Sequence, residues 1–473
     1  MRRRCPTRAT LPPLRLLLAL LACAWPSALA AQTAEAAADS AWRSGDRERA
    51  YVLYNELLAG DSTHTVALHR TALVHASAGR YRESLHLLDR LLALQPDDRA
   101  AAMTRATVLL WRGDLIAAEV EWRALHEQDR ADQLALAGLA RTLRWQGRDA
   151  AARELLMRGR PPLPDELEVG EEMRRNRVAL RPHALPALWH ERDSDRARIT
   201  TLRSEFAWRP EPRLQLGVDG YVRRARRGAT AARAQGAALT AWRQREPGWA
   251  LRAALGGSVS DVADAAPFLI AAIGAETPLR ERFGGTLDVR TGAFDVTGPL
   301  IENQVRITEA ALAGWIRGVG WRLDANASLA ELYARASRQD NLRTGASLAF
   351  MTPLSALVTV GARLHTFGFD DELADGYFSP ERYSLAELVV RGGGEVDHWS
   401  LSGDGAAGAQ RVNGGALTGS WRGSGRFAFR LAPGREVALL LNAARSGLES
   451  VSPDGDAPGH SYLAAGLSMT WTF

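Results

Sequence analysis

Few residues of this 473-residue chain are arranged as a catalytic site would require. His365 with Glu387 or Asp397 is a conceivable histidine–acid pair, but no nucleophile is marked beside it. The sequence has no Gly-x-Ser-x-Gly elbow and no His-Glu-x-x-His motif, which are common local signatures of hydrolases. It also contains no lysine, which excludes a Walker-type phosphate loop and a Schiff-base lysine. We therefore expect no enzyme, no metal site and no cofactor.

Polar residues instead recur at every second position in the second half of the chain. Residues 321–329 alternate Trp, Leu and Ala with Arg, Asp, Asn and Ser, and residues 214–223, 286–290 and 358–365 follow the same pattern. A period of two indicates β-strands with one apolar and one polar face. Segments of about ten residues are long enough to cross a bilayer as tilted strands.

Short and long connections alternate between these segments. Short ones carry turn residues, as at 246–248 and 432–435, whereas long ones occur at 295–304, 370–382 and 447–459. Outer-membrane barrels have this alternation, and lipid leaves no partner for an open sheet edge. A water-exposed sandwich or propeller would also alternate, but it would rarely keep so many charges opposite an apolar face.

We predict an antiparallel outer-membrane β-barrel of about 16 strands over residues 183–473. About sixteen strands leave an aqueous channel rather than a filled core. The predicted lumen-lining residues are Asp219, Tyr221, Arg223, Arg252, Asp288, Arg290, Arg322, Asp324, Asn326, Arg363 and His365. Such a mixed-charge wall could hydrogen-bond a sugar polymer and stack its rings on Tyr221. The same residues could instead pair with one another and only keep the lumen wet.

The last strand is predicted to close the barrel against the first, near residues 185–190. Leu467, Met469, Trp471 and Phe473 share the face expected to contact lipid. The terminal aromatic residue also resembles the signal that the barrel assembly machinery reads.

A 34-residue repeat precedes the barrel. Gly45, Gly79, Gly113 and Gly147 keep this spacing, and each unit is typical of a helix, a glycine turn and a second helix. The pattern resembles tetratricopeptide repeats, and we assign it to residues 36–162 as an α-solenoid of about four repeats. Such a solenoid commonly binds a protein partner, although a spacer or folding aid remains an alternative. Residues 163–182 are predicted to be a linker.

Residues 1–30 are predicted to be a signal peptide. Five arginines, the apolar stretch 16–25 and the small residues at 28–30 fit an exported chain, whereas an uncleaved anchor or a lipoprotein modified at Cys23 fits less well. Removing these arginines brings the net charge of +5 near zero, so charge gives no argument for nucleic-acid binding. Both cysteines lie in this segment, so the mature chain would have no thiol.

The segment GYFSPERYSL, residues 376–385, resembles a motif near the barrel end of the cellulose synthase operon protein C family. The motif corresponds to Gly376, Tyr377, Phe378, Ser379, Pro380 and Tyr383. Glu381 stands where the family more usually has Gln, and typical members have many more than four repeats. Repeats followed by a barrel are also the plan of the poly-N-acetylglucosamine export porin.

The resemblance implies an outer-membrane channel that exports an exopolysaccharide, either cellulose-like or an amino-sugar polymer, in a Gram-negative bacterium. The implied partners are outer-membrane lipid, the assembly machinery, the polysaccharide cargo and a periplasmic protein bound by the repeats. Two alternatives stay open. One is a small-solute porin or envelope-maintenance barrel with the repeats as an assembly platform, and the other is an outer-membrane lipid or glycan hydrolase.

Overall fold

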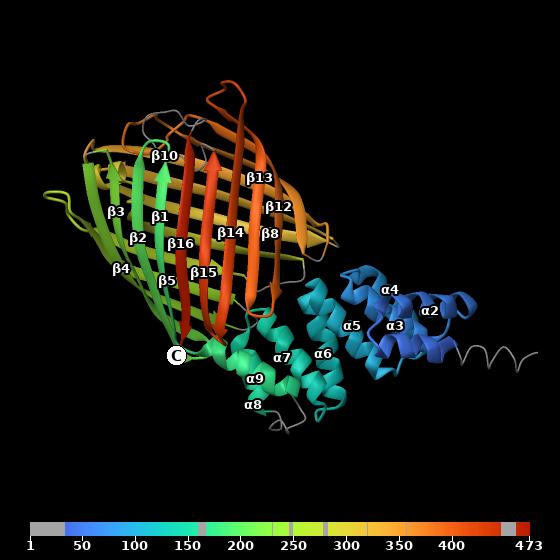
Figure 1. Cartoon of the computed structure of the whole chain (residues 1–473). Helices are drawn as coiled ribbons and strands as arrows, with labels where there is room; N and C mark the ends of the chain where they lie inside the picture. Colours follow the sequence, from blue (N-terminus) through green and yellow to red (C-terminus); the bar gives the residue numbers. More distant parts are fainter. Residues whose placement is uncertain are drawn as a thin grey trace, which may run out of the picture. The chain divides into compact units, whose positions relative to one another are not determined.

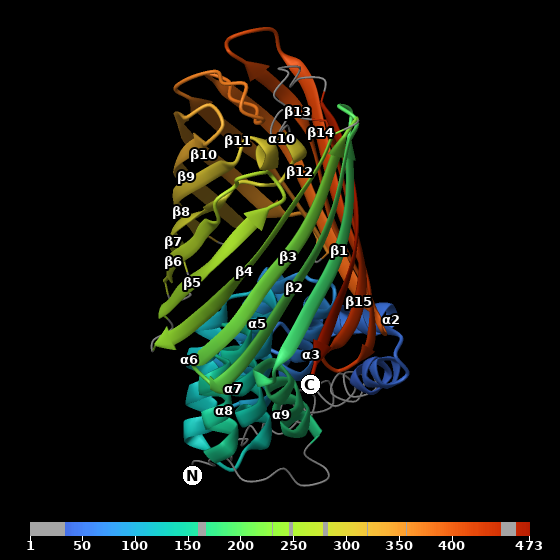
Figure 2. The same ribbon diagram turned by 90° about the vertical axis from the view of Figure 1, so that its left-hand side faces the viewer.

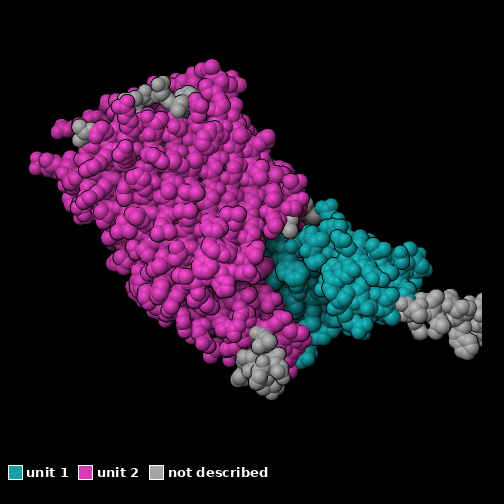
Figure 3. Space-filling view, viewed as in Figure 1, with its two compact units in different colours: residues 1–129 teal, residues 130–473 magenta. Residues whose placement is uncertain are grey.

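The computed structural model describes most of the chain as helices followed by strands (Figure 1). It describes residues 34–158, 167–228, 230–245, 249–277, 282–318, 320–355, 357–445 and 460–473. The predicted signal peptide lies outside the described residues, as do the predicted turn at 246–248 and the predicted loop at 447–459. The chain divides into two compact units, residues 1–129 and 130–473 (Figure 3).

The first unit consists of antiparallel helices with the predicted 34-residue period. Its helices are α2 (Arg47–Gly60), α3 (Thr65–Ser77), α4 (Tyr81–Leu94), α5 (Arg99–Arg112) and α6 (Leu115–Gln128), after a helical stretch at residues 34–43. Tyr54, Leu88 and Trp122 occupy equivalent positions and are all buried between helices. Gly113 ends α5 with φ +84°, and its N–H donates to the carbonyls of Leu109 and Leu110. That left-handed conformation favours glycine and lets the chain reverse into α6.

The second unit begins with three helices. They are α7 (Gln133–Trp145), α8 (Asp149–Arg158) and α9 (Leu167–Leu180). The predicted linker is therefore corrected, because most of residues 163–182 form α9. Glu172 of α9 is 1% exposed and pairs with Arg141 and Arg144 of α7, at 2.7 and 3.2 Å. This buried ion pair explains why a charge-rich stretch is an ordered, packed helix.

Sixteen antiparallel strands follow and form a closed barrel. They are β1 (His183–Asp193), β2 (Ala197–Glu211), β3 (Leu214–Arg227), β4 (Thr230–Arg245), β5 (Trp249–Ser260), β6 (Phe268–Glu276), β7 (Phe283–Ala293), β8 (Val305–Gly318), β9 (Trp321–Ala334), β10 (Gln339–Pro353), β11 (Val358–Phe369), β12 (Tyr383–Val396), β13 (Trp399–Val412), β14 (Thr418–Ala432), β15 (Arg435–Arg445) and β16 (Ser461–Thr472). A short helix, α10 (Gly298–Glu302), interrupts the connection between β7 and β8. The predicted fold class, a repeat solenoid followed by a barrel of about sixteen strands, is confirmed.

The first and last strands pair along their length and close the sheet. Ala187 lies opposite Ser468 and Leu188 lies opposite Leu467, while the N–H of Phe473 donates to the carbonyl of Pro182 at 3.0 Å. We call the end of the barrel where α9 enters β1 the helix end, and the opposite end the far end. The chain makes short turns at the helix end, such as Glu211 to Leu214, and places α10 and the 370–382 loop at the far end.

The outer face of the barrel carries a continuous apolar band. Every strand contributes at least one large apolar side chain that is exposed on the protein. One from each strand is Leu188, Leu202, Val218, Leu239, Leu255, Leu269, Leu287, Leu312, Leu329, Leu348, Leu364, Leu388, Leu401, Phe427, Leu439 and Leu467. A water-soluble protein does not expose such a band, so the barrel is membrane-embedded. No helix among the described residues has the length and apolar character needed to cross a membrane.

Exposed aromatic residues ring the helix end of this band. Trp249, Phe283, Trp321 and Trp399 each begin a strand there, and Phe473 ends the chain beside Phe206, with ring centroids 6.3 Å apart. Aromatic side chains are enriched at the boundary between hydrocarbon and water, where their rings lie at the level of the lipid headgroups. The predicted outward residues Leu467, Met469 and Trp471 lie on the same face of β16.

Replacing Phe473 by Asp is expected to reduce the amount of assembled barrel several-fold. A charge near the bilayer edge destabilises a finished barrel by only about 1 kcal/mol or less, so a larger loss would report failed assembly. The measurement is the heat-modifiable band on semi-native gels of membrane fractions. Phe473→Tyr, which keeps the ring, is the matched control and should assemble normally. Equal amounts of barrel in all three proteins would contradict the expectation.

Candidate functional site

Most of the residues predicted to line the lumen are ion-paired in the structure. Arg252 donates to both carboxylate oxygens of Asp288 at 2.9 Å, across the intervening strand β6. Gly274 of β6 makes this possible, because a Cβ there would lie 2.2 Å from the Asp288 Oδ1. Arg322 pairs with Asp324 on its own strand at 2.6 Å. These pairs keep the wall polar with little net charge.

Other predicted residues pair with acids that were not among the predicted lumen-lining residues. Arg290 contacts Glu309 at 2.6 Å, and Arg363 contacts Glu387 at 3.5 Å. The side chain of Glu387 is fully buried and also pairs with Arg422 at 3.2 Å. The period-two pattern could have indicated this position, because Glu387 lies an even number of residues from Tyr383. It was not predicted to line the lumen because its neighbours in the sequence are mostly apolar.

Three predicted residues are not brought into such pairs. Asp219 and His365 each have a buried side-chain atom without a hydrogen-bond partner, the Oδ1 and the Nε2 respectively. Asn326 faces the lumen on β9, on the same face as Asp324. The conceivable catalytic pairs do not form, since Glu387 is held by arginines and Asp397 lies in the β12–β13 turn at the helix end, whereas His365 lies opposite Leu385 towards the far end.

A folded segment crosses the lumen at the far end (Figure 2). Leu300 of α10 packs into an apolar cluster with residues of β8, β9, β11 and β12, including Ile307, Leu332 and Phe367. Ile301, the next residue, packs instead against Ile199, Ala225 and neighbouring residues of β2 to β4. Because α10 contacts walls on both sides, residues 294–304 narrow the lumen at this end.

An ion pair attaches this segment to β3. Asp295 is 8% exposed. Its carboxylate accepts a hydrogen bond from the hydroxyl of Tyr221 and forms an ion pair with Arg223. Arg223 also donates to the backbone carbonyl of Asp295 at 2.9 Å and to Thr201 at 3.1 Å. Tyr221 and Arg223 were predicted as lumen residues, but their partner was not, because it belongs to a loop.

The family-like motif supports the same segment from the other side. Gly376 has φ +99°, and a Cβ there would lie 2.9 Å from Pro299, so both the backbone conformation and the close approach require glycine. Tyr377 and Phe378 are buried and pack on Phe369 and Phe367, with ring centroids 5.4 and 6.2 Å apart. Burial raises the pKa of Tyr377 to about 12.

The remaining motif residues order the loop and its entry into β12. The hydroxyl of Ser379 donates to the carbonyl of Leu373 at 3.2 Å, and the carbonyl of Pro380 accepts from the N–H of Phe369 at 2.9 Å. Tyr383 is fully buried and donates to the Gln410 side chain at 2.8 Å. The motif thus contacts α10 and the wall, and shapes the narrowing.

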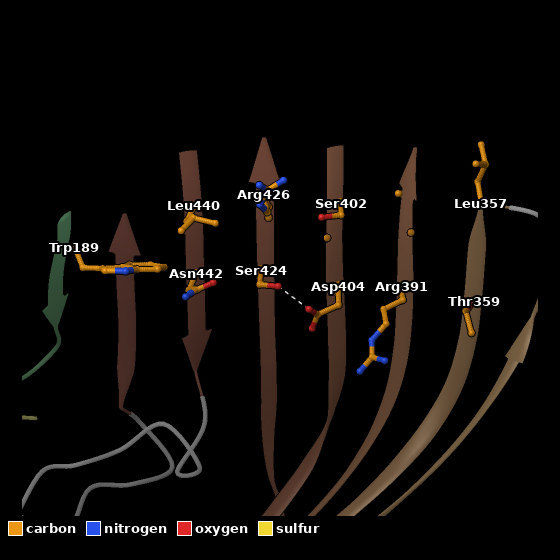
Figure 4. Close-up of a pocket in the computed structure, with 14 residues that line it drawn as sticks. Trp189, Leu357, Thr359, Arg391, Ser402, Asp404, Ser424, Arg426, Leu440 and Asn442 are labelled. Carbon is orange, nitrogen blue, oxygen red and sulfur yellow. Dashed lines mark hydrogen bonds between the residues drawn. The ribbon is translucent and has the colours of Figure 1, made fainter. Parts of the chain in front are cut away.

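Part-way along the barrel the lumen wall contains an open polar groove of about 470 Å³ (Figure 4). Its lining includes Trp189 of β1, Asn442 of β15, Asp404 of β13, Arg391 of β12 and Arg426 of β14. The hydroxyl of Ser424 donates to Asp404 at 2.6 Å, which leaves the groove rich in both donors and acceptors. None of these residues was among the predicted lumen-lining residues.

Aromatic rings lie flat against the wall at three places in the lumen. Trp189 covers Gly466 of β16, where a Cβ would lie 2.7 Å from the indole ring. Tyr221 covers Gly236 and Trp315 covers Gly284 in the same way, with Cβ positions 2.7 and 2.9 Å from the rings. Glycine on the neighbouring strand removes the side chain that would otherwise tilt each ring. One face of each ring can therefore lie towards the lumen.

The helix end of the lumen lies next to α7 and α8. Gln244 of β4 donates to the carbonyl of Gly147 at 3.3 Å, and Arg213 pairs with Glu154 at 3.1 Å. Burial raises the pKa of Asp149, while the nearby positive charge of Arg209 opposes that shift. The last two predicted repeat helices therefore contact the mouth of the barrel.

Comparison with known proteins identifies the repeats. Residues 41–108 match the tetratricopeptide repeat family, and no curated protein matches the chain. A bacterial polysaccharide outer membrane secretin is similar to this chain with 12% identity and a TM-score of 0.49, covering 62% of this chain and 99% of its own. The CymD monoaromatic hydrocarbon channel is similar with 10% identity and a TM-score of 0.33, covering 63% and 91%. Both TM-scores are less than 0.5, so neither similarity supports an argument about the function of this chain.

Replacing Asp295 by Ala is expected to release the segment that crosses the lumen. Removing one partner of a buried ion pair costs about 3–5 kcal/mol, and Arg223 would lose its carboxylate partner and keep only neutral acceptors. Single-channel recordings in planar bilayers should show larger or noisier conductance than the wild-type protein. Asp288→Ala is the matched control, because it breaks a more exposed lumen pair that does not contact α10. Identical recordings for the wild type and Asp295→Ala would contradict this role.

Proposed function

We propose that the chain is an outer-membrane channel that exports an exopolysaccharide. The observation that carries the proposal is the groove around Trp189, where an aromatic face adjoins several hydrogen-bonding groups. A sugar ring has apolar C–H faces and a rim of hydroxyls, so it needs this combination of surfaces. Small hydrophobic solutes would not use the polar groups, and simple ions would not use the indole.

The charge of the groove supports a neutral or weakly charged polymer. Arg391 and Arg426 lie near Asp404, with Asn442 and Ser424 supplying uncharged polar groups. Because Arg426 also pairs with Glu436, the charges nearly balance, and the groove gives no net attraction to a strongly anionic or strongly cationic chain. A cellulose-like or amino-sugar polymer meets this requirement, and the resemblance of residues 376–385 to a cellulose export family favours the same class.

The repeats fit a role in recruitment. With a signal peptide, an even number of strands would leave α9 and Phe473 on the periplasmic side, so the repeats would lie in the periplasm. Tetratricopeptide solenoids present extended surfaces to proteins, and a synthase or polymer-processing protein is the partner that export requires. Four predicted repeats make a short scaffold, so recruitment would occur close to the barrel mouth.

A channel-block experiment tests the cargo. Cellulose-like or amino-sugar oligomers are expected to block single-channel current through the wild-type barrel, and Trp189→Ala should weaken the block about fivefold, because an aromatic contact contributes about 1 kcal/mol. Trp249→Ala, which alters an outward-facing indole, is the control, and the oligomers should block its current as they block that of the wild type. Free passage of unrelated small solutes without block by the oligomers would favour the porin alternative instead.

A clean deletion tests the export function in the cell. Loss of the gene should abolish secreted polymer and leave polymer in the periplasm. A strain that carries Trp189→Ala should secrete less polymer than the wild type. Normal secretion in the deletion strain would exclude the proposal. Hydrolysis of envelope lipids or glucans by the refolded protein would instead support the enzyme alternative.

A further inference from the structure

Three potential metal ligands meet where the barrel closes at the far end. Asp193 ends β1, Asp195 lies in the β1–β2 turn, and His460 immediately precedes β16. One ligand atom from each lies within 4.8 Å of the other two. They are at opposite ends of the barrel sequence, so closure of the sheet alone brings them together.

The backbone holds the three residues in place. Asp193 Oδ1 accepts the N–H groups of Asp195 and Ala197 at 2.9 and 2.8 Å, which fixes the carboxylate over the turn. Ser194 N–H donates to the Ser461 carbonyl at 2.9 Å, and Ser461 N–H donates to Ser194 Oγ at 3.2 Å. These two hydrogen bonds hold Ser461, and with it the preceding His460, next to the β1–β2 turn.

The histidine lacks the partner that its burial demands. His460 is 4% exposed, and its Nδ1 has no hydrogen-bond partner while lying 3.7 Å from Asp195 Oδ2. A buried polar atom without a partner is costly, typically by about 1–3 kcal/mol. The same nitrogen is a good metal ligand when neutral, and both carboxylates are partly exposed, so a cation could enter from the aqueous side.

We propose that Asp193, Asp195 and His460 bind a divalent transition-metal ion, with Zn²⁺ the best fit. One imidazole nitrogen and two carboxylates are a three-ligand Zn²⁺ set, with water as the fourth ligand. Tetrahedral bonds of about 2.0–2.2 Å place ligand atoms about 3.3–3.6 Å apart, which a small rotation of the carboxylates reaches. Ca²⁺ prefers six to eight oxygen ligands and would not use the histidine. The ion would join the first hairpin to the last strand and stabilise the seam.

The test uses the refolded full chain in detergent after removal of metals with a chelator. Zn²⁺ added alone should bind with one ion per chain in calorimetry and raise the temperature at which the heat-modifiable band is lost. His460→Ala and Asp195→Asn should each weaken binding about tenfold or more and abolish the temperature shift. His398→Ala, which alters a turn histidine at the helix end, should behave like the wild type.

Two results would overturn the proposal. If Zn²⁺ leaves the melting of the wild-type barrel unchanged, the cluster is an ion pair only. If His460→Ala and Asp195→Asn bind Zn²⁺ as tightly as the wild type, the ion binds elsewhere. Asp195→Asn preserves side-chain size, so it keeps the test valid if His460→Ala fails to assemble. Neither result bears on polymer export, which is measured separately.

Discussion

Pairing between β1 and β16 closes the sheet and leaves no strand edge exposed to lipid. The hydrocarbon of a bilayer offers no hydrogen-bond partner, and each unpaired backbone group there costs several kcal/mol. The pairing therefore continues to His183 and Thr472 at the ends of the two strands. Because side chains alternate along every strand, this register also sends Leu188 and Leu467 outward together. A slip by one residue would exchange the lipid and lumen faces of a strand.

The interior of the closed barrel is packed differently towards its two ends. Towards the helix end the wall stays polar, and guanidinium and carboxylate groups pair across strands, as Arg252 and Asp288 do. Towards the far end α10 and the 370–382 loop bring Leu300, Phe378 and Tyr383 into an apolar cluster like the core of a soluble protein. The groove adjoins the narrowing, because Trp189 of β1 is paired in register with Thr201 of β2, to which Arg223 donates. A polymer that bound near Trp189 would lie beside the segment attached by Asp295 to Arg223.

The same geometry gives the family-like motif a structural meaning. Gly376 permits the close approach to Pro299, and the adjoining rings fill the space between α10 and the wall. The motif is therefore a contact surface for a folded loop rather than a lining of the open groove. The polar groove, in contrast, depends on residues that lack a local motif, such as Asp404 and Asn442, which adjoin only because β13, β14 and β15 align.

The local periodicities of the sequence were enough to predict the architecture. A 34-residue spacing of glycines specified helical repeats, and a period of two specified strands whose outward faces, such as Leu364 and Leu388, are apolar. The number of strands followed from the same alternation, because alternation is a property of the single strand. The α9 helix was missed because its stability comes from Glu172 pairing with arginines of another helix. Which polar groups meet could not be predicted, because it depends on the folded arrangement of the chain. The contacts of Asp295, Glu387 and His460 depend on loop folding and on the alignment of distant strands, and no local pattern encodes those distances.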